Sequence, residues 1–305
     1  MTDRSLDAWL STRRREVERE LDRLLAPRRD RPASLTRAMR YAVLGPGKRL
    51  RPVLALAAAE AVGGAAARRR ALRPGCAIEM IHAYSLAHDD LPAMDDDDMR
   101  RGKPSLHVRF GEALAILTGD ALLTDAFDAL AHVSSNGSSG SRGPARSLDI
   151  LAEVARAAGG VGMVAGQVLD LANEGRRGVS LSTVRAIHSR KTGALLRACV
   201  RAGAIAGGAS APQLARLSTY GESFGLVFQI TDDILDEVGS LAALGKPSGG
   251  DRERGKATYP ALLGLEGARR EAQRAARRGV AALAPFGERA APLEALLRRV
   301  LSRAS

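Results

Sequence analysis

The sequence predicts an all-α fold, and both its composition and its apolar periodicity support that prediction. Ala, Leu, Arg and Glu, which favour helices, dominate the 305 residues, and no run alternates β-branched with polar side chains. Apolar stretches recur at helical spacing through the whole length, with Gly, Pro and Ser between them. Because no repeat and no proline-rich linker divides the chain, we expect residues 1–305 to form a single bundle of about ten helices.

The expected helices follow this punctuation along the chain. In the first half they are Leu6–Leu25, Val53–Val62, Arg73–Asp90 and Glu112–Val133. In the second half they are Ser147–Leu171, Ser182–Ile205, Pro212–Val238, Thr258–Leu283 and Pro292–Ser302. The Ser- and Gly-rich residues 134–147 are too polar to pack, so we expect a flexible surface loop there rather than a domain boundary.

The charge of the chain raises the question of nucleic-acid binding. The net charge is +12, but the arginines come in short runs scattered over segments that we expect to be exposed helix faces. Aromatic residues make up only 3% of the sequence, which leaves little to stack on bases. The sequence therefore favours an arginine-rich solvated surface and no nucleic-acid partner.

Two observations bear on the compartment. Cys76 and Cys199 are isolated and lack metal-type spacing, which favours buried free thiols in a reducing environment. The N-terminus has no apolar signal segment, and the apolar run Val53–Ala67 is interrupted by Glu60 and is too short to span a bilayer. We expect a cytoplasmic protein without stable membrane insertion.

Two aspartate clusters carry the main functional signal. Three aspartates lie within residues 88–95 and three within residues 231–236, and apolar residues that would bury them flank each group. Carboxylates gathered in this way need a cation, and a set of oxygen ligands favours Mg²⁺ over Zn²⁺. Mg²⁺ in proteins usually completes its shell with water and substrate phosphate. The clusters therefore indicate an enzyme that acts on diphosphates.

The second cluster needs only a regular helix. Asp232 and Asp236 are one turn apart on the same face, and Asp233 lies beside them. An unbroken helix would present all three carboxylates to one metal cluster.

The first cluster can form only if the helix that carries Asp89 ends before Asp95. On a regular helix Asp89 and Asp95 would lie about 120° from each other. Pro92 is expected to end the helix near Asp90 or Leu91, so that Asp95 turns back towards Asp89. An alternative interpretation of residues 95–98 is an acidic cap on the next helix. The presence of a second cluster favours the metal site.

Further motifs in order along the chain carry a family resemblance. From about Arg37 to the Leu262 region the chain resembles the trans-polyprenyl diphosphate synthases, and in particular their bacterial short-chain farnesyl diphosphate synthase branch. The matching segments are Gly47–Pro52, Ile81–Ser85, Asp89–Asp95, Met99–Gly102, Gly119–Ala121, Gly166–Asp170, Lys191–Gly193 and Phe228–Asp236. A lone pair of aspartates would be a weak signal, whereas this ordered set is specific.

The resemblance implies a helical bundle around a central active-site cavity and a reaction in which an allylic diphosphate loses its diphosphate. About three Mg²⁺ would neutralise the leaving group. Their ligands would be Asp89, Asp90, Asp95, Asp232, Asp233 and Asp236. The positions that match allylic-diphosphate contacts are Arg100, Lys191, Thr192, Gln229, Lys246 and Lys256, with Arg100 and Lys191 also counted as catalytic.

The second substrate, isopentenyl diphosphate, keeps its diphosphate, so side chains alone should hold it. The resemblance gives this role to Lys48, Arg51, His82 and Arg101, whose charges suit phosphate oxygens. Otherwise Lys48–Arg51 would be a basic helix start, and His82 a core histidine. The family commonly has Gly-Gly before the lysine, whereas Pro46 here stiffens the loop and removes one N–H donor.

Product size in this family depends on bulk below the first motif. Tyr84 lies five residues before Asp89, about 7.5 Å down the helix, and with Ser85 favours farnesyl diphosphate as product. A geranylgeranyl diphosphate synthase is the near alternative. A terpene cyclase would not need the isopentenyl pocket, and a non-catalytic helical binding protein would need no acidic clusters. The resemblance also implies a homodimer.

Overall fold

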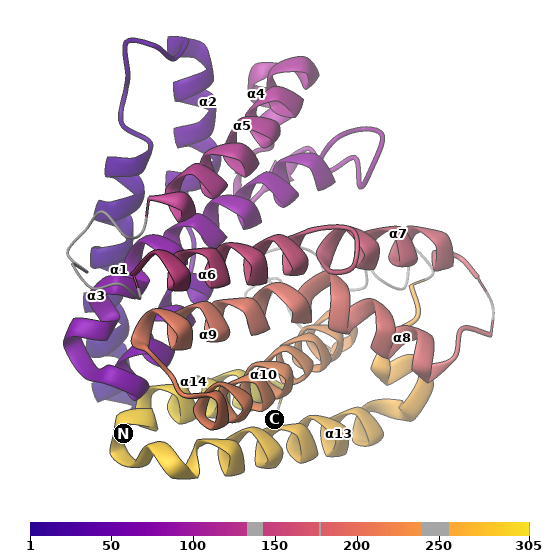
Figure 1. The fold of residues 1–305 in the computed structure, drawn as a ribbon. Helices are drawn as coiled ribbons and strands as arrows, with labels where there is room; N and C mark the ends of the chain where they lie inside the picture. Colours follow the sequence, from indigo (N-terminus) through magenta and orange to yellow (C-terminus); the bar gives the residue numbers. More distant parts are fainter. Residues whose placement is uncertain (133–142, 177, 239–255, 305) are drawn as a thin grey trace.

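The computed structural model describes residues 1–132, 143–176, 178–238 and 256–304, and within them the all-α prediction is confirmed (Figure 1). The N-terminal half contains α1 (Asp3–Leu24), α2 (Ala33–Leu44), α3 (Leu50–Asp89), β1 (Met99–Arg100), β2 (Lys103–Pro104), α4 (Leu106–Phe110) and α5 (Glu112–Ala131). The C-terminal half contains α6 (Gly143–Ala158), α7 (Met163–Asn173), α8 (Leu181–His188), the π-turn η2 (Ser189–Gly193), α9 (Ala194–Gly207), α10 (Ala211–Val238), α13 (Tyr259–Leu283), η3 (Ala284–Ala290), α14 (Ala291–Leu301) and η4 (Ser302–Ala304).

The long helix α3 joins two helices that the sequence predicts separately. It is kinked at Gly63–Gly64, where the backbone leaves helical geometry, and then continues through Pro74 to Asp89. The intervening residues are Ala- and Arg-rich and were not expected to be helical. The kink falls directly after Val62, where the first predicted helix ends. Because Ala and Arg are strong helix formers, residues 65–72 then continue as helix into the second predicted helix.

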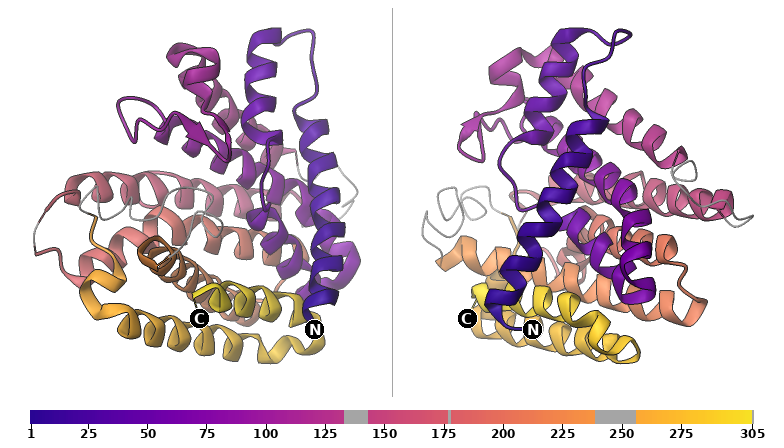
Figure 2. Two further views of the ribbon diagram at one scale, coloured as in Figure 1. Left: turned by 180° about the vertical axis from the view of Figure 1, so that it is seen from behind. Right: turned by 90° about the vertical axis from the view of Figure 1, so that its left-hand side faces the viewer.

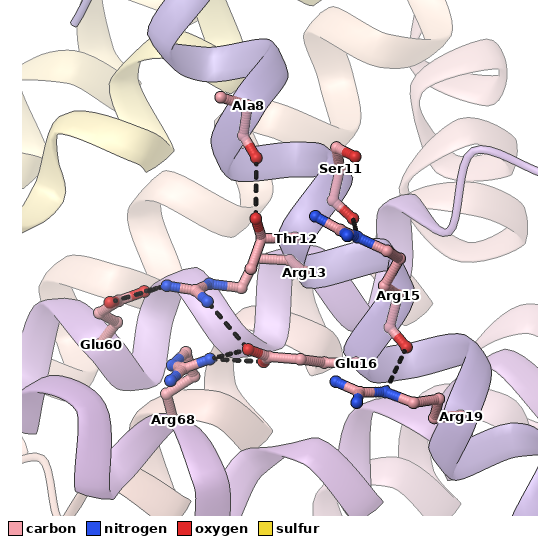
Figure 3. A network of polar contacts seen from close by, with 9 residues as sticks. All are labelled: Ala8, Ser11, Thr12, Arg13, Arg15, Glu16, Arg19, Glu60 and Arg68. Atoms are coloured by element: carbon pink, nitrogen blue, oxygen red, sulfur yellow. Dashed lines mark hydrogen bonds and ion pairs between the residues drawn. The ribbon is translucent and has the colours of Figure 1, made fainter.

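An ion-pair network holds α1 against both sides of this kink (Figure 3). Arg13 Nη2 lies 3.3 Å from Glu60 Oε1, just before the kink. Arg68, just after it, lies 2.5 Å from Glu16 Oε1 through its Nη1. Arg13 also contacts Glu16 at 3.0 Å, so the four side chains form one connected network. The network fixes the angle between the two parts of α3 and the position of α1.

Several boundaries differ from the sequence prediction. The expected helix Ser147–Leu171 is split, because the glycine-rich residues 159–162 end α6 before α7 begins. Residues 143–147, which were expected in the polar loop, form the start of α6, and the rest of that loop lies outside the described residues. The helices α2 and α4 and the small antiparallel pair β1–β2 were missed.

The packing places each aspartate cluster beside its own small apolar group. The largest core lies between α3, α5, α9 and α10, and α10 also packs on α13. A second group contains Ile230 and Ile234, which flank the second aspartate cluster. A third contains Ala87 and Leu91, which flank the first. The bundle thus supports the two clusters independently.

Both termini lie at one end of the bundle (Figure 2). Arg299 on α14 forms ion pairs with Asp3 and Asp7 on α1, which ties the two ends together. Among the described helices, α3 alone is long and apolar enough to qualify as a membrane span, but 56% of its most apolar window is buried inside the fold. That burial is typical of a core helix.

Candidate active site

The second aspartate cluster lies on a continuous stretch of α10, as the sequence predicts. Asp232 and Asp236 are one turn apart, and the helix runs on to Val238. Asp233 is almost fully buried and accepts hydrogen bonds from Gln229 Nε2 and from the backbone N–H of Tyr259, both at 3.0 Å. Asp232 Oδ1 lies 3.3 Å from Arg303 Nη1 near the C-terminus. Asp232 and Asp233 are thus engaged by protein donors.

The first cluster lies where α3 ends. The helix stops at Asp89 and Asp90 caps it, after which the backbone N–H of Asp95 donates to the carbonyl oxygen of Asp89 at 2.8 Å. The predicted break at Pro92 and the return of Asp95 towards Asp89 are therefore confirmed. Burial and the charge of Asp95 raise the pKa of Asp89 to about 6, although Lys191 opposes the shift.

The chain after the first cluster does not form the helix that the alternative acidic-cap interpretation requires. It enters β1, and Arg100 on this strand donates through Nε to Asp90 Oδ1 at 2.8 Å and through Nη2 to Asp97 Oδ2 at 2.9 Å. The sequence predicted that Asp90 binds a metal ion and that Arg100 binds a diphosphate. In the structure the two side chains form an ion pair with each other. Asp90 is buried, so this pair holds Arg100 at the edge of the cluster.

The donor set fits magnesium, although the described residues contain no preassembled metal centre. Among them no three carboxylate, imidazole or thiolate side chains come together as a ready ligand group. The six aspartates nevertheless supply oxygen ligands only, which Mg²⁺ prefers. The pKa of Asp89 is raised chiefly by burial and also by the neighbouring carboxylates of Asp95 and Asp90, against the opposing charges of Lys191 and Arg100. A divalent cation would add to these opposing charges.

Cations from two other elements approach the same region. Lys191 lies on the π-turn η2, and its Nζ is 2.6 Å from Asp170 Oδ2 on α7. Lys256, the first residue described after position 255, places its Nζ 3.6 Å from the same oxygen. Thr192 follows Lys191 on the turn and is half-buried, while Lys246 lies outside the described residues. Lys191 and Lys256 are therefore brought together by Asp170.

A second group of cations surrounds His82, and the buried carboxylate of Glu79 lies close enough to act on Arg51 and Arg101. Burial and the guanidinium groups of Arg51 and Arg101 lower the pKa of His82 well below its usual value, so the ring is neutral at pH 7. Arg101 Nη2 lies 3.4 Å from His82 Nε2. Because a guanidinium only donates, Nε2 accepts and the ring proton is on Nδ1. Burial also lowers the pKa of Arg51, whose Nε is buried without a hydrogen-bond partner.

The loop before α3 is held by arginines through its carbonyl oxygens. Arg49 Nη2 donates to Gly45 at 2.7 Å, Arg101 Nη1 to Pro46 at 3.2 Å and Arg14 Nε to Lys48 at 3.1 Å. Arg49 and Arg101 both have left-handed backbones, with φ of 50° and 53°, a conformation that costs about 1–2 kcal/mol in a residue with a side chain. The N–H that proline lacks is therefore not what orders this loop. Its carbonyl groups are used instead.

The surroundings of Tyr84 are buried and include a histidine that the sequence prediction left without a role. The Tyr84 ring packs edge-on against His88, with centroids 5.5 Å apart. His88 Nε2 lies 3.0 Å from the carbonyl oxygen of Ile116 on α5. A Cβ on Gly119 would lie only 2.1 Å from His88 Nε2, so a larger residue there would displace the His88 ring. The Ser85 hydroxyl donates a hydrogen bond to the carbonyl oxygen of His82, with Oγ and O 2.9 Å apart.

Sequence reasoning missed four residues that the structure places at the site. Asp170 lies in one of the family motifs but was given no role, and the sequence prediction assigned no role in the site to Arg14, His88 or Arg303. Burial lowers the pKa of Lys48, and the positive charge of Arg303 lowers it further. Only the motif containing Asp170 carried a signal in the sequence, because Arg14 and Arg303 look like ordinary members of a basic surface.

Comparisons with known proteins agree with this geometry. The family model for polyprenyl synthetase matches residues 32–282. The chain is 45% identical over 293 residues to a farnesyl diphosphate synthase of Escherichia coli (strain K12), covering 95% of this chain and 96% of that protein. It is 46% identical over 275 residues to geranylgeranyl pyrophosphate synthase 11, chloroplastic, of Arabidopsis thaliana, covering 89% and 75%.

A solved structure extends the agreement to the fold. The geranyltransferase of Legionella pneumophila superposes with a TM-score of 0.85 at 32% sequence identity and covers 98% of both chains. The chain belongs to the polyprenyl synthetase family.

Proposed function

We propose that this chain condenses isopentenyl diphosphate with an allylic diphosphate, dimethylallyl or geranyl, and that farnesyl diphosphate is its main product. The observation that carries the proposal is the division of the site into two chemically different halves. One half offers aspartates that suit a metal-bound diphosphate. The other offers Arg51 and Arg101 around a neutral His82, with a buried Arg51 donor left unsatisfied.

Each half suits a different fate of the diphosphate it binds. In the allylic substrate the C–O bond breaks, the electron pair leaves with the diphosphate, and an allylic cation remains. The alkene of isopentenyl diphosphate then supplies the electron pair of the new C–C bond, and a proton leaves. A diphosphate that departs needs strong charge neutralisation, whereas one that stays needs only to be held.

The aspartates at 89, 90, 95, 232, 233 and 236 would hold Mg²⁺, about three ions per site, and bound Mg²⁺ would supply neutralisation of the leaving diphosphate. Lys191 would bind the same diphosphate through its ammonium, with Thr192, Lys256 and Arg100 beside it. Gln229, which donates to Asp233, orients that carboxylate. Lys246 is kept as a proposed contact from the sequence.

The isopentenyl half would work without metal. Arg51 has a buried N–H without a partner, and His82 carries its proton on Nδ1, so both can donate to phosphate oxygens. The hydrogen bonds from Arg14, Arg49 and Arg101 to the loop carbonyls hold the loop that carries Lys48, to which the family resemblance gives a contact with the same diphosphate. Preorganised donors of this kind bind a phosphate at low entropic cost.

The test is incubation with Mg²⁺, isopentenyl diphosphate and each allylic primer, followed by chromatography of the dephosphorylated products. Farnesol is expected as the main product. Geranylgeraniol would favour the alternative geranylgeranyl diphosphate synthase. A cyclic hydrocarbon formed without isopentenyl diphosphate would indicate a terpene cyclase. No turnover, with no Mg²⁺-dependent thermal shift on adding a diphosphate analogue, would indicate a non-catalytic binding protein.

We also propose a homodimer. Val164, Val168 and Leu171 are exposed along one side of α7, and Val161 precedes them at the same spacing. An apolar stripe of this kind favours a second copy of the chain, in line with the homodimer that the family resemblance implies. Light scattering should give about twice the monomer mass, and Val168→Glu should give the monomer. A wild-type monomer at micromolar concentration would contradict the proposal.

A cytoplasmic location without membrane insertion or nucleic-acid binding completes the proposal. Its support is that Cys76 and Cys199 are both free and buried, as the sequence predicts, which suits a reducing compartment. Fractionation of the producing cell, followed by immunodetection, would test the location. Recovery with the membrane fraction after a salt wash would contradict it.

A further inference from the structure

Asp170 brings together two lysines from distant parts of the chain. It lies on α7, and its Oδ2 is 2.6 Å from Lys191 Nζ on η2 and 3.6 Å from Lys256 Nζ before α13. All three side chains are mostly buried, with exposed fractions of 17% for Asp170, 26% for Lys191 and 17% for Lys256. One carboxylate thus serves two ammonium groups that the proposed function assigns to the allylic diphosphate.

The backbone explains why Asp170 meets Lys191. A Cβ on Gly166 would lie 2.1 Å from the backbone nitrogen of Lys191 and 2.5 Å from its Cα, so only glycine lets α7 pack directly on the π-turn. Asp170 is one helical turn after Gly166 and lies on the same face of α7. The close approach that Gly166 allows therefore brings the Asp170 carboxylate to the Lys191 side chain.

The charge balance leaves this group able to bind an anion. Burial by itself would raise the pKa of Asp170, but the ammonium groups of Lys191 and Lys256 outweigh it and hold the pKa below its usual value. The carboxylate is therefore ionised at neutral pH, and the three groups together carry one net positive charge. Because an ammonium has three N–H donors, one contact with Asp170 does not exhaust it.

We propose that Asp170 is a positioning residue, which holds the Lys191 and Lys256 ammonium groups close together so that both can bind the allylic diphosphate. The inference rests on the proposed function. Without the carboxylate, the two like charges repel each other and two flexible side chains lose a fixed geometry. Each would then have to be ordered again when the substrate binds.

A simple electrostatic role for Asp170 predicts the opposite change in diphosphate affinity when the residue is removed, so the inference can be tested. If Asp170 only contributed negative charge, its removal would leave more positive charge for the diphosphate and would strengthen binding. If Asp170 positions the lysines, its removal weakens binding although the net charge becomes more favourable. The direction of the change in diphosphate affinity therefore separates the two roles.

The matched control is a carboxylate of similar burial away from the aspartate clusters. Glu153 on α6 has an exposed fraction of 14% and forms an ion pair with Arg201 on α9, with Oε1 and Nε 2.7 Å apart. Glu153→Gln removes a partly buried ion pair just as Asp170→Asn does, but without touching Lys191 or Lys256. Any effect common to both variants reflects general stability.

The experiment compares wild type, Asp170→Asn, Asp170→Glu and Glu153→Gln. For Asp170→Asn we expect kcat/KM with geranyl diphosphate to fall at least about tenfold, which corresponds to about 1.4 kcal/mol, while KM for isopentenyl diphosphate changes less than about twofold. Asp170→Glu should recover part of the loss. Glu153→Gln should leave both values unchanged. A rise in kcat/KM, an equal effect on both substrates, or the same pattern in Glu153→Gln would overturn the inference.

A binding measurement separates this inference from the proposed function. Calorimetry with inorganic diphosphate and Mg²⁺ needs no turnover, and Asp170→Asn should bind about tenfold more weakly than wild type. Equal or tighter binding by Asp170→Asn overturns the inference even if wild type is an active prenyltransferase. Weaker binding by the variant, with a wild type that turns over no prenyl diphosphate, supports Asp170 and overturns the proposed function instead.

Discussion

The two clusters each contain three aspartates, but their backbones are built in different ways. The second follows from helix periodicity on α10, and Asp233 is locked by Gln229 and by the backbone of Tyr259. The first lies beyond a helix end, in a turn whose backbone hydrogen bonds include one from the N–H of Asp95 to the carbonyl oxygen of Asp89. The comparison shows that a regular helix and a proline-terminated one can each present acidic groups, with different degrees of protein support.

The difference extends to what lies around each cluster. Asp233 belongs to the buried structure, because its partners include a backbone N–H at the start of α13. The first cluster is followed by the small β1–β2 pair, which carries Arg100 to Asp90. We infer that the second cluster is the rigid half of the proposed clamp and the first the half that adjusts when metal and substrate bind.

The largest expected effect is common to both clusters. Asp89→Ala and Asp232→Ala should each lower kcat by at least about 10²–10³-fold, because each would remove a ligand of the cation that neutralises the leaving diphosphate. Steady-state rates with geranyl and isopentenyl diphosphates measure the effect, and circular dichroism should show an intact helical signal. Excess chelator should abolish wild-type activity in the same way.

The two variants test the two clusters separately. A loss confined to Asp232→Ala would mean that the first cluster binds no essential metal. Wild-type rates in both variants, or in chelator, would remove the metal clamp from the proposed mechanism.

The next effect concerns the proposed isopentenyl half of the site. Arg51→Ala should raise KM for isopentenyl diphosphate about 10–100-fold, the range expected for losing hydrogen bonds between charged groups. KM for geranyl diphosphate should change far less, since the aspartate clusters stay intact. Initial rates with each substrate varied in turn provide the measurement. Equal changes for the two substrates would mean that Arg51 does not distinguish them.

Much of this site could be predicted because its geometry follows from local rules. The spacing of Asp232 and Asp236 fixes their common face on a helix, and Pro92 fixes the place where α3 ends. Both depend on residues close together in the sequence. Gly63–Gly64 likewise break α3 where the first predicted helix ends, but the Ala- and Arg-rich residues beyond them are helical, which the prediction missed.

What could not be predicted depends on contacts between distant segments. Nothing near Asp170 in the sequence indicates that Lys191 and Lys256 share its carboxylate, and nothing near Arg303 indicates that it reaches Asp232. The basic composition hid these cations, since most arginines do lie on solvated faces. The family resemblance pointed to residues that bind substrate, whereas the residues that hold them in place became visible only in three dimensions.

A smaller effect should distinguish the two clusters directly. Asp233→Ala should lower the free energy of unfolding by about 1–3 kcal/mol, because it leaves the buried N–H of Tyr259 unpaired. Asp95→Ala should change it much less, since the loss of its charge also relieves repulsion with Asp89. Urea unfolding without metal or substrate measures both. An equal loss in the two variants would contradict the distinction between a rigid and an adjustable cluster.

The last prediction concerns the buried aromatic ring below the first cluster on α3. Tyr84 lies about 7.5 Å before Asp89 along the helix and packs against His88, which α5 holds through the Ile116 carbonyl. If this ring stops the growing tail, Tyr84→Ala should lengthen the products by one or more C5 units, and the helix should survive because Ala is the better helix former. Tyr84→Phe keeps the ring and should leave the products unchanged. Chromatography of dephosphorylated products at identical substrate ratios measures both variants, and an unchanged distribution in Tyr84→Ala would place the determinant of chain length elsewhere.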